Sequence, residues 1–165
     1  MTARTENSVV INAPLDLVWS RTNDVANWPA LFTEYAKAEI LAEEDGRVRF
    51  RLTMHPDENG NEWSWVSERV ADRTTRVVLA HRAEPGWFRF MHIRWTYDEV
   101  DDGVLMRWVQ EFEMRPDAPV DDAAMAENIN TNSSVQMTAI KAKLETEESL
   151  QRSSAKEYGE SWKKH

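Results

Sequence analysis

The chain has 165 residues, of which 41% are hydrophobic and 30% charged, so a soluble globular protein with one core is expected rather than a disordered chain. Its formal net charge of -9 argues against a nucleic-acid surface, which needs clustered lysine and arginine. The lack of cysteine excludes disulfides and thiolate metal sites.

Three further features narrow the class of protein. Residues 1–6 lack the apolar core of a signal peptide, and no apolar run could span a bilayer, so a cytoplasmic protein without membrane attachment is expected. The four histidines show no metal-binding spacing, and no metal site is predicted. Eight tryptophans are unusual in this length, and each buried indole N–H needs an acceptor, so either the core or a pocket is aromatic.

The N-terminal part predicts one strand and two short helices. Residues 8–12 are rich in β-formers, and Pro14 suits the first turn of a helix whose apolar positions then recur at helical spacing. A second short helix is predicted from Asp24 to about Tyr35, with Trp28 on its apolar stripe.

The middle of the chain changes to a period of two, which is typical of half-buried antiparallel strands. Turn signals such as Asp101-Asp102-Gly103 separate the alternating segments. The predicted strands cover residues 38–42, 47–54, 61–70, 76–82, 88–100 and 104–114.

The strand over residues 61–70 differs from the others. Alternation places Trp63, Trp65, Ser67 and Arg69 on one face. An inward arginine on a mid-sheet strand is costly to desolvate unless it is paired or faces a wet cavity. This face therefore predicts a pocket wall rather than plain packing.

A long helix is predicted from an N-cap at Asp121 to about Glu148. Its C-terminal half is an ordinary amphipathic stripe. Its N-terminal half places Asn132, Ser133 and Gln136 on or beside that stripe, where apolar residues would be cheaper to bury. Water or a polar ligand is expected against this part of the helix.

These elements predict an α+β helix-grip fold. In this fold a curved antiparallel sheet of seven strands wraps around a long C-terminal helix, and an interior pocket lies between them. Residues 1–150 form the predicted single domain. Residues 151–165 are polar and are predicted to be a flexible tail.

Several strings resemble the monodomain aromatase/cyclases of bacterial type II aromatic polyketide synthases, within the Bet v 1/START-type superfamily. The similarity is strongest to the non-reducing type of tetracenomycin-like and spore-pigment pathways, and it runs from about residue 5 to about residue 147. The similar strings lie in residues 7–14, 22–29, 31–36, 63–69, 92–97 and 106–112.

The resemblance implies an enzyme that directs the first-ring aldol closure, of the C9–C14 type, and the dehydration of a linear poly-β-ketone. The implied partners are the acyl carrier protein that bears this chain and the ketosynthase/chain-length factor of the minimal synthase. No cofactor is expected.

Two residues are predicted to be catalytic. The Arg69 guanidinium would polarise a substrate carbonyl and stabilise the developing enolate or alkoxide, and the alternative is an ion pair with Glu34 or a similar carboxylate. The Tyr35 phenol would deliver a proton or order a water, and the alternative is a packed tyrosine with its hydroxyl at the surface.

Eight further residues are predicted to bind substrate. Ser67 would hydrogen-bond substrate oxygen or hold Arg69, and Asn132 and Gln136 would offer amides. Core packing is the alternative for each aromatic residue. The predicted aromatic walls come from Trp28, Trp63, Trp65, Trp95 and Trp108.

Two other functions stay open at this stage: a non-catalytic carrier of a hydrophobic aromatic or lipid ligand, and an interaction module. The polar groups on the predicted pocket wall argue against the carrier, and the lack of a large leftover apolar stripe argues against the module. Docking of an acidic carrier protein would need a local basic patch, with arginines at positions 47, 49, 51, 82 and 89 as candidates.

Overall fold

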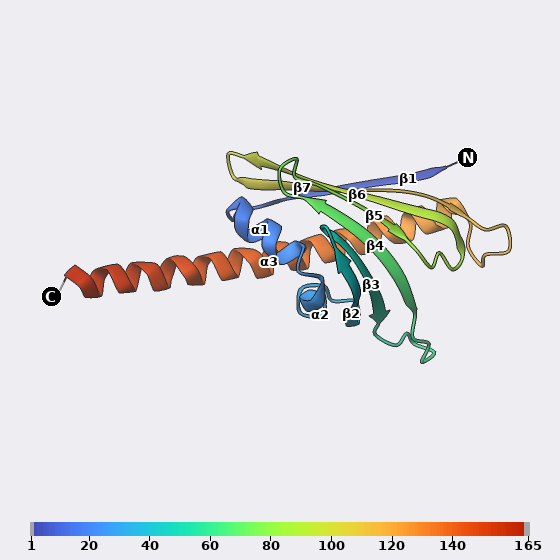
Figure 1. Cartoon of the computed structure of the whole chain (residues 1–165), viewed down its shortest axis with the longest axis horizontal. Coiled ribbons are helices and arrows are strands. Elements are labelled where there is room, and N and C mark those ends of the chain that lie inside the picture. The colour runs from blue at the N-terminus through green and yellow to red at the C-terminus, as the bar shows by residue number, and fades with distance from the viewer. Residues whose placement is uncertain (1, 164–165) are drawn as a thin grey trace.

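The computed structural model describes the backbone of residues 2–163 and the side chains of residues 2–154. Its strands form one curved antiparallel sheet, and helix α3 (Asp122–Lys163) lies along the concave side (Figure 1). The short helical segments α1 (Leu15–Thr22), η1 (Val25–Asn27) and α2 (Trp28–Leu31) connect the first two strands. The predicted helix-grip class is confirmed.

The sheet order is β1-β7-β6-β5-β4-β3-β2, so every strand except β1 lies beside its neighbour in the chain. Gly103, with φ of 134°, is required where the β6–β7 hairpin meets the end of β1, because a Cβ there would overlap the carbonyl oxygen of Ile11. The strands are β1 (Ala3–Ile11), β2 (Tyr35–Glu44), β3 (Arg47–Met54), β4 (Ser64–Asp72), β5 (Val77–Arg82), β6 (Phe88–Val100) and β7 (Gly103–Met114).

Apolar side chains join the sheet to its helices in two separate clusters. In the larger cluster, Ile140 and Leu144 of α3 are buried among residues of the sheet, α1 and α2. In the smaller one, Met125 and Ile129 near the start of α3 pack against a cluster that includes Phe112. The polar residues at positions 132, 133 and 136 fall between the two clusters, so helix and sheet are held together at both ends of this polar segment.

Helix α3 begins where the sequence predicts and ends later. The Asp121 carboxylate accepts a hydrogen bond from the backbone N–H of Ala124 at 2.8 Å, which confirms the N-cap. The predicted end near Glu148 is wrong, since the helix continues to Lys163 and projects past the sheet (Figure 1). The i,i+4 pair of Glu148 with Arg152 favours continuation of the helix past the predicted end. The flexibility of residues 151–165 stays a prediction.

Two element boundaries near the predicted site also differ from the predicted ones. The helix predicted to reach Tyr35 ends at Leu31, because Phe32 is extended, and Tyr35 starts β2 opposite Met54. The predicted strand over residues 61–70 begins only at Ser64. Within residues 2–163, no helix combines the length and apolar character that a membrane span requires.

Candidate functional site

A cavity of about 1060 Å³ lies between the sheet and α3, under the polar segment of the helix. This volume suits a small organic ligand. Aromatic rings make up much of the wall, and polar and charged side chains lie among them. The lining includes Trp28, Phe32, Glu34, Tyr35, Phe50, Trp65, Ser67, Arg69, Arg82, Trp95, Trp108, Gln110, Asn132, Ser133 and Gln136.

Strand β4 supplies three of the predicted site residues to this cavity. Trp65 lies opposite Leu52 of β3, and Ser67 lies opposite Phe50, which places both on the core face of the sheet. Arg69 follows on the same face and is 3% exposed. The predicted alternation of Trp65, Ser67 and Arg69 is therefore confirmed, because an antiparallel strand turns every second side chain to one face.

The guanidinium of Arg69 lies against two tryptophan rings. Its Cζ is 5.1 Å from the ring centroid of Trp28 and 5.0 Å from that of Trp95. A desolvated cation over an aromatic face is stabilised by about 2 kcal/mol. The stacking therefore holds the guanidinium in one place on the cavity wall.

No carboxylate pairs with Arg69 in the part of the chain that the structure describes. Burial lowers its pKa to about 10, and the neighbouring Tyr97 partly opposes that shift. Arg69 therefore stays cationic at neutral pH. Its ion pair with Glu34, which the sequence left open, is not formed. A buried cation without an anion is costly, and such a group at a cavity is typical of a functional site.

Stacked indole rings form one wall of the cavity. The ring centroids of Trp95 and Trp108 are 4.7 Å apart with planes 14° from parallel, and Trp28 stacks on Trp95 at 5.8 Å. The Trp28 indole N–H donates to the backbone carbonyl of Thr22 at 3.1 Å, which fixes its orientation. These rings give the cavity a flat, rigid side.

Tyr35 lies in the cavity wall with Glu34 beside it, rather than on the helix that was predicted. Burial together with the charge of the neighbouring Glu34 raises the Tyr35 pKa well above its usual value. Tyr35 is therefore a proton donor at neutral pH. Its predicted alternative, a hydroxyl at the surface, does not fit a side chain that is 9% exposed.

Sequence reasoning did not assign several polar residues to the cavity, among them Glu34, Arg82 and Gln110. The Arg82 Cζ lies 4.1 Å from the Trp65 ring centroid. Burial lowers the pKa of Arg82 to about 10, and the nearby Tyr35 and Glu34 partly oppose this shift. Alternation from the buried Val78 could have placed Arg82 on the core face. Glu34 carries no periodic signal, because it lies in the turn that precedes β2.

Gln136, which is predicted to offer an amide to substrate, lines the cavity and bonds to Thr33. Its carbonyl accepts from the Thr33 backbone N–H at 2.8 Å, and its amide donates to the Thr33 hydroxyl at 2.7 Å. Asn132 donates to Glu34 at 2.9 Å and accepts from the Gln136 amide at 3.3 Å. These two α3 residues line the cavity, and their hydrogen bonds hold the segment before β2.

Gln136→Leu is expected to lower the free energy of unfolding by about 1–3 kcal/mol, because Thr33 loses partners for its N–H and hydroxyl. Urea unfolding followed by circular dichroism measures this change. The neighbouring Val135→Ala, on the exposed side of α3, is the control and should change stability by about 0.5 kcal/mol or less. Equal stability of both variants would contradict a structural role for Gln136.

Trp63 lies at the rim of the cavity rather than on the inward strand face that was predicted. Its side chain is 49% exposed, and its indole N–H donates to the Asp57 carboxylate at 3.2 Å. The same carboxylate accepts from the backbone N–H groups of Asn59 and Asn61, and these bonds lower the Asp57 pKa. The loop before β4 therefore orients Trp63 at the cavity mouth.

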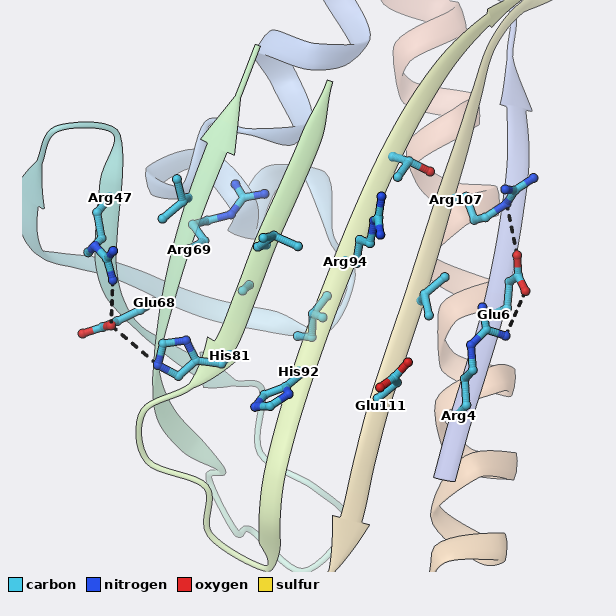
Figure 2. A pocket seen from close by; sticks show the side chains of 16 residues that line it. Arg4, Glu6, Arg47, Glu68, Arg69, His81, His92, Arg94, Arg107 and Glu111 are labelled. Atoms are coloured by element: carbon cyan, nitrogen blue, oxygen red, sulfur yellow. Dashed lines mark hydrogen bonds and ion pairs between the residues drawn. The ribbon is translucent and has the colours of Figure 1, made fainter. Parts of the chain in front are cut away.

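A second hollow, of about 700 Å³, lies on the outer face of the sheet (Figure 2). Its charged side chains largely pair with one another. Glu6 contacts Arg4 at 3.1 Å and Arg107 at 3.2 Å, and Glu68 contacts Arg47 at 3.9 Å. Figure 2 shows these pairs at the two sides of the hollow, with Arg94 between them. The outer hollow therefore differs from the aromatic cavity in its ion pairs, and Arg69 contributes to the lining of both.

The histidines predicted to be structural or surface groups belong to this outer face. His81 and His92 are exposed and lie opposite one another on β5 and β6, and His81 is 3.6 Å from Glu68. Among residues 2–154, no cluster of side chains is suited to hold a metal ion.

Four of the five arginines predicted as docking candidates already have carboxylate partners. Arg82 faces the cavity instead, so it is wrong as a surface candidate. The pairs are Arg47 and Arg49 with Glu68, Arg51 with Glu84, and Arg89 with Glu113.

Known proteins resemble the chain over most of its length. A family model described as polyketide cyclase/dehydrase and lipid transport matches residues 2–145. A Streptomyces cyaneus relative described as a polyketide cyclase is 57% identical over 145 residues, or 88% of this chain and 95% of its own length.

Two solved structures share the fold. The Zhui aromatase/cyclase from a Streptomyces species has a TM-score of 0.76 at 24% identity, covering 88% of this chain and 94% of that chain. A START superfamily protein from Mycobacterium smegmatis has a TM-score of 0.75 at 15% identity, covering 87% and 98%. At these identities the likeness concerns the fold alone.

Proposed function

The chain belongs to the polyketide cyclase/dehydrase and lipid transport family, and on that premise we propose that it closes and aromatises the first ring of a linear poly-β-ketone. The ring forms between C9 and C14. An acyl carrier protein presents the substrate, and a ketosynthase/chain-length factor supplies it. The description of the Streptomyces cyaneus relative supports the cyclase role.

One observation carries this proposal: Arg69 is a buried cation on the wall of an aromatic cavity and has no carboxylate partner among the described residues. Aldol closure places negative charge first on an enolate oxygen and then on an alkoxide. A fixed guanidinium in a site of low dielectric stabilises that charge without reorganising. Ser67, buried on the same face, is placed to hydrogen-bond a neighbouring substrate oxygen.

The aromatic wall determines which carbon meets which carbonyl. A poly-β-ketone cyclises readily, so holding one folded conformer is the larger part of the task. The stacked Trp28, Trp95 and Trp108 offer a flat surface that suits a chain as it becomes a planar ring. Closure and dehydration are acid–base steps, and the proposed reaction requires no cofactor.

The rival function is a carrier of a hydrophobic ligand, which the family description also covers. A carrier needs an apolar lining. Arg69, Arg82 and Glu34 in one cavity argue against it, because each must be desolvated without helping an apolar ligand.

Adding the chain to a minimal polyketide synthase tests the proposal. The expected result is a shift of the product mixture toward compounds whose first ring joins C9 to C14, identified by mass spectrometry and NMR. Omission of the chain is the control. A product mixture that is the same with and without the protein, together with an apolar ligand that co-purifies with it, would support the carrier instead.

A further inference from the structure

Ring closure needs a base as well as a cation, because it begins with loss of a proton from a methylene carbon between two ketones. Two carboxylates line the cavity in the described part of the chain, Glu34 and Glu84. Glu84 is exposed and pairs with Arg51 at 3.2 Å, so it is directed to the rim. Tyr35 keeps its proton, since its pKa is raised well above its usual value.

We propose that Glu34 is the general base of this site and that Tyr35, the next residue of the cavity wall, relays the proton to the substrate oxygen. This inference rests on the proposed function and assigns the base for its proton transfers.

The surroundings of Glu34 suit this role. Asn132 from α3 donates to its carboxylate at 2.9 Å, and Tyr35 of β2 and the Arg82 cation of β5 line the same cavity and interact with its charge. Burial raises the Glu34 pKa, and these three neighbours partly oppose that shift. The result is a carboxylate held in one orientation that binds an abstracted proton more strongly than an exposed glutamate does.

The proton balance closes in both steps. In the aldol step Glu34 removes a methylene proton, the C–H electron pair forms the enolate, and the enolate carbon bonds to the ketone carbon. The resulting alkoxide takes the Tyr35 proton, and Tyr35 takes the proton from Glu34. In the dehydration Glu34 removes the remaining proton at that carbon, the C–O bond breaks, and the leaving hydroxide takes the Tyr35 proton to become water. Tyr35 again recovers the proton from Glu34.

The test follows proton abstraction alone, without ring closure. The probe is 1-phenylbutane-1,3-dione in D₂O, and NMR records the exchange of its methylene protons with the full chain present. Wild-type protein should accelerate exchange over buffer, and Glu34→Gln should lower that acceleration about 10²-fold. The glutamine preserves size, and its carbonyl oxygen can still accept from Asn132. Because the Glu34 pKa is raised, the wild-type acceleration should fall as pH drops through a value above the usual glutamate range.

The matched control is Glu39→Gln, which removes the same charge from the exposed surface of β2 and should exchange the probe like wild type. Glu34→Asp, with a shorter carboxylate, should keep part of the acceleration. Exchange by Glu34→Gln at the wild-type rate, or no acceleration by wild type, would overturn the assignment. Glu34-dependent exchange without any effect on polyketide regiochemistry would instead refute the proposed cyclisation and leave the base in place.

Discussion

Arg69→Met is expected to lower the rate of regiospecific first-ring closure by about 10²–10³-fold, the range for loss of a single oxyanion donor. Methionine preserves much of the volume and the contact with Trp28 and Trp95 while it removes the charge that faces the cavity. The measurement is product identity and rate with a minimal synthase. Shunt products with other first rings should replace the C9–C14 product, because spontaneous cyclisation continues.

Stability separates this effect from misfolding. Arg69 is buried without an anionic partner in the described chain, so removing its charge also removes a desolvation penalty. The free energy of unfolding of Arg69→Met should equal or exceed that of wild type. Arg94→Met, on the exposed outer face of β6, is the control for both measurements and should leave regiochemistry unchanged. Unchanged regiochemistry and yield in Arg69→Met would exclude the proposed role.

Trp28→Ala is expected to lower the free energy of unfolding by about 3–5 kcal/mol, the usual range for removing a buried tryptophan. Its ring packs against Phe32, Tyr35, Phe50 and Trp95, and it is 5% exposed. The change also widens the cavity and frees the Arg69 guanidinium on one side. Chemical denaturation measures the first effect, and a broader product mixture reports the second.

The matched control is Trp87→Ala, because Trp87 is the same residue type at the rim and is 41% exposed. Its free energy of unfolding should change by about 0.5 kcal/mol or less. Trp28→Phe retains a ring and should lie between wild type and Trp28→Ala. Equal destabilisation at positions 28 and 87 would contradict the assignment of Trp28 to the core wall.

Alternation along the chain predicted most of the sheet. The boundaries of β3 and β6 agree with the predicted strands, and the core faces of β6 and β7 carry the predicted residues, such as Trp95 and Trp108. The same rule placed Ser67 and Arg69 on the cavity wall, because side-chain direction in a strand depends only on residue parity. It did not predict the exposure of Trp63, which precedes the first paired residue of β4 and lies at the cavity rim.

Such local rules could not predict contacts between residues that are far apart in the sequence. Gln136 bonds to Thr33, 103 positions earlier, and no local pattern indicates this contact. Likewise, the surroundings of Glu34 in the cavity come from two other elements, since Asn132 lies on α3 and Arg82 on β5.

By itself the sequence determined the helix-grip order of elements, the aromatic character of the interior and the inward face that holds Arg69, since periodicity and turn chemistry are local properties. Only the tertiary structure decided that Arg69 meets two indole rings instead of Glu34, and that Glu34 and Tyr35 form a pair beside Arg82. The physical reason is that the pairing and desolvation of a charged group depend on which distant groups share its cavity. The local sequence around a residue does not identify those groups.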